Sequence, residues 1–247
     1  MPFSLFISDL HLSDDTPEIM ELFLAFLKET APQAEQLYIL GDLFDAWVGD
    51  DDDSTSGKQV IDALAALSGF TDVFFIHGNR DFLVGEQFSL NSHVTLLPDP
   101  AIISIGGQHI LITHGDQLCT DDVEYQKARI MRCNPEWIRE FLSKPLQERK
   151  QLAVAYRKMS GETKSGLAEE IMDVNEDAVI NWFEQFDVNL MIHGHTHRPA
   201  THDYLLEGEE KQRIVLPEWY ANKALALQID EDLEMTGIPI QRMVQKS

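Results

Sequence analysis

The stretch LYILGDLFD, at residues 37–45, joins a short apolar run directly to a cluster of acidic side chains. The apolar run 37–40 has the length and composition of a buried strand. Asp42 and Asp45 come after it, and Gly41 allows the backbone to turn sharply where the run ends. This stretch therefore predicts a strand whose carboxyl end presents carboxylates.

The same arrangement of apolar run and polar cluster recurs along the chain. It is repeated in FSLFISDLH (3–11), VFFIHGNRD (73–81), ILITHGD (110–116) and LMIHGHTH (190–197). In α/β folds, ligands bind beyond the carboxyl ends of strands, so the five clusters are expected to converge on one cleft. Each cluster alone is a weak signal, because polar turns are common. Five clusters in order, each after a strand, are far more specific.

The clusters offer carboxylate, carboxamide and imidazole groups and no thiolate. The candidate metal ligands are Asp9, His11, Asp42, Asn79, His114, His195 and His197. This donor set suits Mn, Fe, Zn or Mg rather than a closed structural zinc site. Seven ligands are too many for one small cation but suit two ions that share a carboxylate. Two ions roughly 3.5–4 Å apart can hold both the attacking and the phosphoryl oxygens of an in-line displacement, so the sequence predicts a two-metal phosphoesterase.

Apolar runs alternate with stretches of helical periodicity along the chain. A helix is expected to begin at Pro17 with Thr16 as its N-cap, and Gly106-Gly107 is typical of a hairpin turn. Strands are predicted at 3–7, 37–40, 73–76, 94–97, 102–105, 110–113, 190–192, 214–216 and 224–229, with helices at 60–67 and within 121–186. We interpret residues 1–247 as one α/β domain of two packed mixed β-sheets flanked by helices, with a helical insertion at 121–170.

Charge is distributed unevenly along the chain. The formal net charge is −23, yet residues 127–164 contain ten Lys/Arg and four Glu, a net of +6, which leaves −29 for the rest. So acidic a surface argues against nucleic acid as a partner, whereas the basic segment favours an anionic partner there. The acidic run 50–53 lacks the spaced ligands of a calcium loop and is expected to be a solvated loop.

No targeting or membrane-spanning segment is recognisable in the sequence. No signal peptide is expected, and no apolar run approaches the ~18 residues needed to span a bilayer. Cys119 and Cys133 form neither a C-x-x-C motif nor a disulfide framework, so both are expected to be thiols in a reducing cytosol.

The five clusters resemble, in this order, the calcineurin-like metallophosphoesterase superfamily, from about residue 4 to residue 200. The resemblance implies one ion on Asp9, His11, Asp42 and His197, and a second ion on Asp42, Asn79, His114 and His195. It also implies that Asp45 and Asp81 orient the ligands. Many members carry a histidine where this chain has Arg80, which cannot act as a general acid at neutral pH but can clamp a phosphoryl oxygen.

Longer stretches resemble one family within that superfamily, the UDP-2,3-diacylglucosamine diphosphatases. They are YILGDLFDAWVGDDD (38–52), FIHGNRDFLVGEQF (75–88), HGDQLCTDD (114–122), IMDVN (171–175) and LMIHGHTHRPA (190–200). The resemblance implies hydrolysis of the pyrophosphate bond of UDP-2,3-diacylglucosamine in lipid A biosynthesis. The products would be UMP and 2,3-diacylglucosamine 1-phosphate (lipid X), and the cofactors would be two divalent ions, expected to be Mn²⁺.

The same resemblance implies a set of substrate contacts, with Arg80, Asn79 and His195 as the catalytic residues among them. The contacts are Asn79, Arg80, Asp122, Tyr125, Arg157, Ser160, Lys164 and His195. Two positions depart from the family, because Leu167 stands where a lysine is usual and Pro217 where a glycine is usual. Either Lys164 takes over the role of the missing lysine or the alignment shifts locally.

The insertion combines apolar and basic side chains. Trp137, Phe141 and Tyr156 lie among the basic residues, and we interpret this pattern as a surface for acyl chains rather than only for packing. Basic side chains beside apolar ones suit an anionic membrane surface. A peripheral position on the cytoplasmic face of the bacterial inner membrane is therefore expected.

Two other functions share these metal ligands. One is a phosphoesterase for a cyclic nucleotide, nucleotide or phosphoprotein, although such a substrate does not require the insertion. The other is a metal-binding scaffold without catalysis, which a missing ligand would indicate, yet all seven ligands are present.

Overall fold

A computed structural model describes residues 2–164 and 173–241, without the side chains of 159–164. The first sheet has the order β11-β10-β1-β2-β3-β4. Its strands are β1 (Phe3–Ile7), β2 (Gln36–Leu40), β3 (Asp72–Ile76), β4 (Thr95–Leu97), β10 (Ala224–Asp230) and β11 (Met235–Ile240). The strands β1 to β4 are parallel, because helical crossovers connect the first three and α3 leads into the fourth. The connecting helices are α1 (Pro17–Glu29), α2 (Thr55–Leu67) and α3 (Glu86–Ser92), with a 3₁₀ turn η1 (Ala31–Gln33).

The second sheet has the order β5-β6-β7-β9-β8. Its strands are β5 (Ala101–Ile105), β6 (Gln108–Ile112), β7 (Leu190–His193), β8 (Ala200–Leu206) and β9 (Glu209–Val215). β6, β7 and β9 are parallel, whereas β5 and β8 pair antiparallel at the two edges. Gly106 and Gly107 turn the chain between β5 and β6, both with positive φ, which confirms the predicted hairpin.

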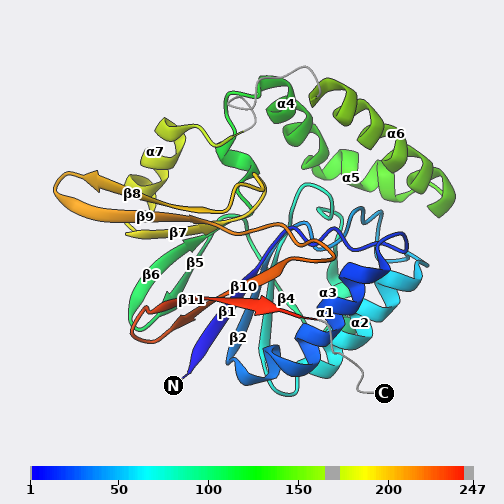
Figure 1. Cartoon of the computed structure of the whole chain (residues 1–247). Coiled ribbons are helices and arrows are strands. Elements are labelled where there is room, and N and C mark those ends of the chain that lie inside the picture. The colour runs from blue at the N-terminus through cyan, green and yellow to red at the C-terminus, as the bar shows by residue number, and fades with distance from the viewer. Residues whose placement is uncertain (1, 165–172, 242–247) are drawn as a thin grey trace.

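The two sheets pack face to face with helices on their outer faces (Figure 1). Phe6 and Tyr38 of the first sheet and Ile110 and Ile192 of the second belong to the buried cluster between them. A larger buried cluster lies beneath α1 and α2, and Phe183 of α7 (Glu176–Phe186) belongs to a third against the second sheet. The predicted fold class, two packed mixed sheets flanked by helices, is therefore confirmed.

Between β6 and β7 the chain forms a 3₁₀ turn η2 (Asp116–Leu118) and then α4 (Val123–Arg132), α5 (Pro135–Leu142) and α6 (Leu146–Lys164). We call α4, α5 and α6 the cap helices. They lie together beyond the ends of the strands, above the first sheet in Figure 1. None of the helices in the described ranges 2–164 and 173–241 is long and apolar enough to cross a membrane.

The acidic run 50–53 lies in a loop in which Asp51 and Asp53 are exposed, as expected, and it also contacts α6. Arg149 of α6 is buried; its guanidinium donates to Val48 O and to both carboxylate oxygens of Asp51. Lys150 pairs with Asp53. Asp50 accepts hydrogen bonds from Trp47 Nε1 at 3.0 Å and from two backbone N–H groups. The run is thus partnered by positive charge more than 90 residues further along the chain, which local pattern cannot reveal.

Several elements differ from the sequence prediction. Helix α2 begins at Thr55, five residues before the predicted start, because the Ser54 side chain caps it by accepting from Gly57 N at 3.1 Å. Thr16 precedes α1 as predicted, but its side chain bonds Ser13 and does not cap the helix. The elements β8, β11 and α3 were not predicted.

Candidate metal centre

The five polar clusters lie together where β1, β2, β3, β6 and β7 end. Backbone hydrogen bonds tie their loops to one another. Leu10 N donates to Asp42 O at 2.9 Å, and His195 N donates to the Asp9 carboxylate at 2.9 Å. Because the strands of each sheet that carry the clusters are parallel, their carboxyl ends meet at one edge, and all seven candidate ligands are brought together.

The backbone is left-handed at five of these seven positions. The φ values are 57° at Asp9, 50° at His11, 51° at Asp42, 68° at His195 and 57° at His197. A non-glycine residue in this region costs on the order of 1–3 kcal/mol, and such residues cluster at functional sites. The fold therefore maintains an unfavourable backbone at the residues whose donor atoms converge.

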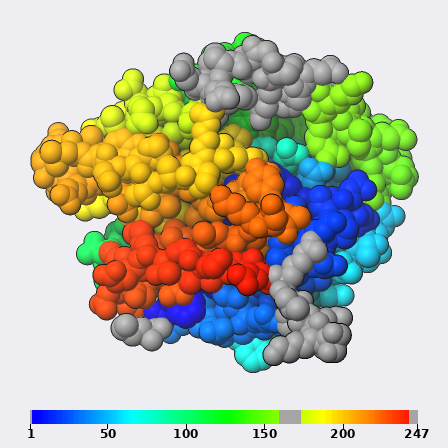
Figure 2. All heavy atoms as spheres, in the orientation of Figure 1, coloured from blue at the N-terminus to red at the C-terminus, as the bar shows by residue number. Residues whose placement is uncertain are grey.

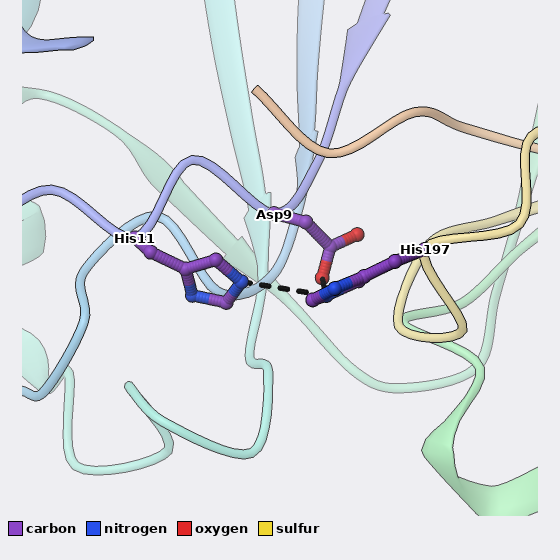
Figure 3. A group of neighbouring side chains, drawn as sticks. All are labelled: Asp9, His11 and His197. Carbon is purple, nitrogen blue, oxygen red and sulfur yellow. Dashed lines mark hydrogen bonds and ion pairs between the residues drawn. The ribbon is translucent and has the colours of Figure 1, made fainter. Parts of the chain in front are cut away.

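Asp9, His11 and His197 form the first group (Figure 3). Asp9 Oδ1 lies 3.3 Å from His197 Nε2, and His11 Nε2 lies 3.4 Å from the same nitrogen. Asp9 Oδ1 and His11 Nδ1 are buried atoms without a hydrogen-bond partner. Unpartnered buried polar atoms are costly, and a divalent cation would satisfy an oxygen and nitrogen donor set of this kind. The residues therefore fit a metal ion.

Asp9, Asp42 and His114 form the second group, with donor atoms within 4.8 Å of one another. His114 Nδ1 donates to Leu40 O at 2.8 Å, which directs Nε2 into the site, where it would bind a metal after losing its proton. The Asp42 carboxylate lies between the groups, with Oδ1 3.8 Å from His114 Nε2 and Oδ2 3.9 Å from His11 Nδ1. That is the position expected of a bridging ligand.

Asn79 and His195 complete the second group. His114 Nε2 lies 3.2 Å from Asn79 Oδ1 and 3.2 Å from His195 Nδ1. His114 Nε2 thus has an amide oxygen and an imidazole nitrogen nearby and the Asp42 carboxylate slightly further away. A cation placed among these atoms would have oxygen and nitrogen donors on several sides.

The carboxylates hold protons on two of the imidazoles. Burial alone lowers the pKa of His114, but Asp42, Asp9 and Asp116 outweigh it and raise that pKa to about 9. Burial also opposes protonation of His197, yet the nearby carboxylates of Asp9 and Glu218 raise its pKa to about 10. A divalent cation would supply the same positive charge, so metal binding is expected to release protons.

Asp81 connects two of the loops that carry metal ligands. Its buried carboxylate accepts hydrogen bonds from four backbone N–H groups, those of Asp42, Leu43, Phe44 and Gly78. Burial and the charge of Asp42 raise the pKa of Asp81 to about 7, against the backbone donors. One side chain thus joins the loops after β2 and β3, which agrees with the orienting role that the resemblance implies.

Asp45 lies between two guanidinium groups. Arg80 Nη1 donates to Asp45 Oδ1 at 2.8 Å, and Arg157 of α6 donates to Asp45 Oδ2. Arg80 also lies 3.7 Å from Asp42 Oδ2 and is 36% exposed, so it borders the metal groups and solvent. The predicted substrate contacts Arg80 and Arg157 are therefore neighbours, although β3 and α6 lie far apart in sequence.

The other predicted substrate contacts lie around the metal ligands or outside the described residues. The Tyr125 ring centroid lies 5.7 Å from that of His195. Asp122 is the N-cap of α4 and accepts a hydrogen bond from Tyr125 N at 2.9 Å. The side chains of Ser160 and Lys164 lie outside the described residues, as does Leu167, so their predicted roles stay predictions.

Sequence reasoning missed Asp116 and Glu218. The buried Asp116 carboxylate accepts from Tyr125 OH at 2.9 Å, Arg129 Nε at 3.0 Å and Arg132 Nη2 at 3.1 Å, and so fixes α4 beside His195. Asp116 ends the cluster ILITHGD (110–116), and this position could have identified it as a site residue. Glu218 Oε2 lies 2.8 Å from His197 Nδ1, on a segment that was noted only for its departure at Pro217.

A family model described as calcineurin-like phosphoesterase matches residues 4–199, a span that contains every candidate ligand. The chain belongs to the calcineurin-like phosphoesterase family. Its members are hydrolases that use divalent metals, which agrees with the two groups of donors.

Three relatives cover nearly the whole chain, and each is named UDP-2,3-diacylglucosamine hydrolase. The protein of Haemophilus influenzae (strain PittGG) is 47% identical over 95% of this chain and 98% of the relative. That of Chromohalobacter salexigens is 44% identical over 93% and 94%. That of Escherichia coli O7:K1 is 43% identical over 96% and 99%. The resemblance found in the sequence is thereby confirmed.

Proposed function

We propose that this protein hydrolyses the pyrophosphate bond of UDP-2,3-diacylglucosamine and releases UMP and 2,3-diacylglucosamine 1-phosphate. The observation that carries the proposal is the convergence of Asp9, Asp42 and five further metal donors beside Arg80. Relatives at 43–47% identity over most of the chain carry the name of this hydrolase, which supports the choice of substrate.

The metal ligands in this proposal are the two sets that share Asp42. Asp9, His11, Asp42 and His197 would hold one ion, and Asp42, Asn79, His114 and His195 the other, with Mn²⁺ as the metal. Bound ions would supply Lewis-acid activation of a water molecule and of the phosphoryl oxygens.

Arg80 binds and orients the pyrophosphate. Its guanidinium is held at the site by Asp45 and offers N–H donors to a phosphoryl oxygen, where negative charge grows during the reaction. Asn79 and His195 contact the phosphate as well as binding metal. Arg157 and Tyr125, both on the cap helices, contact the same substrate.

We propose that residues 121–170 are an insertion within a single domain of residues 1–247, and that its cap helices receive the acyl chains. Ile130, Val154 and Tyr156 of these helices are exposed large hydrophobic side chains. Arg139 and Lys127 are exposed basic residues on the same helices. An apolar and basic surface beside a phosphoester site suits a substrate with two acyl chains on an anionic membrane. The protein would then work as a peripheral protein at the cytoplasmic face of the inner membrane.

Purified protein incubated with UDP-2,3-diacylglucosamine and Mn²⁺ tests the proposal, with UMP release as the readout. We expect UMP to appear with Mn²⁺ and to disappear when a chelator removes the metal. Asp42→Asn is the matched inactive control. Hydrolysis of a generic phosphodiester without UMP release would replace the proposal with another phosphoesterase. Two bound ions without either reaction would indicate a scaffold.

A further inference from the structure

Glu218 lies on a short segment that follows β9 and is hydrogen-bonded at one end to β7 and at the other to the loop that carries Asp9. Leu216 N donates to His193 O at 2.7 Å, and Trp219 N donates to Asp9 O at 3.1 Å. In Figure 2 the orange atoms of the segment after β9 border the blue atoms of the N-terminal segment. The backbone on each side of Glu218 is therefore held against the last residue of β7 and the loop after β1.

The next residue fixes this segment still further. Trp219 is 1% exposed, packs edge-on against Phe23 and Phe26 of α1, and donates from Nε1 to Leu225 O at 3.1 Å. A side chain anchored in the core next to Glu218 leaves the carboxylate little freedom to move away from the site.

The Glu218 carboxylate faces the outer nitrogen of His197. Oε2 lies 2.8 Å from His197 Nδ1, and Tyr220 OH donates to the same oxygen. Because a carboxylate accepts and does not donate, His197 carries a proton on Nδ1. Its other nitrogen, Nε2, is the one directed at Asp9 Oδ1 and His11 Nε2 (Figure 3).

We propose that Glu218 is a positioning residue that fixes the ring orientation and tautomer of His197, so that Nε2 is the metal ligand. This inference rests on the proposed metal centre. A carboxylate that accepts from the outer nitrogen of a ligating histidine raises the basicity of that histidine. Tyr220 in turn holds the carboxylate in place.

Calorimetric titration of metal-free protein with Mn²⁺ tests this role. We expect Glu218→Ala to weaken one of two Mn²⁺ sites about 10–100-fold and to leave the other unchanged. Glu218→Gln keeps an acceptor oxygen for His197 and is expected to stay within about threefold of wild type, on the scale of a retained hydrogen bond. Glu184→Ala, an exposed glutamate on α7, is the matched control.

The outcomes separate the inference from the proposed function. Wild-type Mn²⁺ affinity in Glu218→Ala would overturn the positioning role and leave the metal centre intact. Equal losses in Glu218→Ala and Glu218→Gln would also overturn it, because they would mean that the carboxylate binds the ion directly. Wild-type protein that binds no Mn²⁺ would instead refute the metal centre. If Glu218→Ala does not fold, Glu218→Asp, one carbon too short to reach His197, replaces it in the comparison.

Discussion

Arg80 is the cation of the loop after β3, and it is held between Asp42 and Asp45. Removing a group that stabilises developing charge typically costs about 100–1000-fold in turnover. We expect Arg80→Ala to lower kcat for UMP release by that factor at saturating Mn²⁺. Arg80→Lys should recover only part of the activity, because a single ammonium group lacks the two-pronged geometry of a guanidinium.

Arg80 is proposed to hold a phosphoryl oxygen and not to bind metal, and the two roles can be measured separately. Calorimetric titration of Arg80→Ala should show two Mn²⁺ sites of wild-type affinity, because Arg80 is not a ligand. Lys58→Ala, an exposed change of the same charge on α2, is the control. Turnover of Arg80→Ala at the wild-type rate would exclude the clamping role.

Asp81 is the acceptor for four backbone N–H groups on two ligand-bearing loops. In Asp81→Asn the amide group would turn its own N–H donors toward some of these backbone donors. Leaving buried donors without acceptors costs about 1–3 kcal/mol each, so we expect about 3 kcal/mol less free energy of unfolding in urea. Asp232→Asn, an exposed change, should leave the midpoint unchanged. A wild-type midpoint for Asp81→Asn would contradict the bracing role.

At the scale of single residues, the sequence predicted the donors that directly follow strands. Asp9, Asp42 and His114 were identifiable because each stands immediately beyond a buried apolar run. Glu218 was not, because its partner His197 lies 21 residues earlier and only the path of β8 and β9 brings them together. Helix propensity and periodicity carry no information on such a contact.

Among the elements, α6 depends on an ion pair with the acidic run 50–53. The hydrogen bond from Arg149 holds the pKa of Asp51 below its ordinary value. A lowered pKa in the folded protein means that the pair stabilises fully above the ordinary pKa of about 3.9 and that this contribution is lost as the pH falls through the lowered pKa. We expect Asp51→Asn to lower the melting temperature by a constant amount from pH 8 to pH 5. The difference should shrink below about pH 4.

Melting curves recorded by circular dichroism across this pH range measure the effect. Asp62→Asn, on the exposed face of α2, is the control and should track wild type at every pH. A melting difference for Asp51→Asn that stays the same at pH 3 would show that the Arg149 pair is not its source.

The elements that could be predicted were those with a buried face. β1, β2 and β3 have continuous apolar runs because both of their faces are covered, so their positions were found to within a residue. β8 is largely exposed and polar at the edge of its sheet, and β11 contains Gly237 and Pro239. These edge strands exist because a neighbour supplies hydrogen bonds, and local composition does not reveal that.

In the whole molecule, the basic residues of the cap helices stand apart from an otherwise acidic chain. Each Lys or Arg near an anionic bilayer contributes about 1 kcal/mol of attraction. We expect Lys127→Gln, Arg139→Gln and Lys158→Gln together to weaken binding to phosphatidylglycerol vesicles about 100-fold. Wild-type binding should itself fall as salt rises, because salt screens exposed charges.

Vesicle flotation at low and high salt measures this binding. The control combines Lys28→Gln, Lys58→Gln and Lys223→Gln, which remove the same charge from exposed positions outside the cap helices. Equal loss in both triple variants would mean that net charge alone matters and that the cap helices are not the docking surface.

The left-handed backbone at Asp9 and Asp42 affects how an inactive form of this protein should be made. Asparagine tolerates that conformation nearly as well as aspartate, whereas alanine resists it. Alanine at either position would therefore remove a ligand and also push the loop towards another shape. Structural work on a trapped substrate complex would be better served by asparagine, which removes the charge and keeps the loop geometry that receives the substrate.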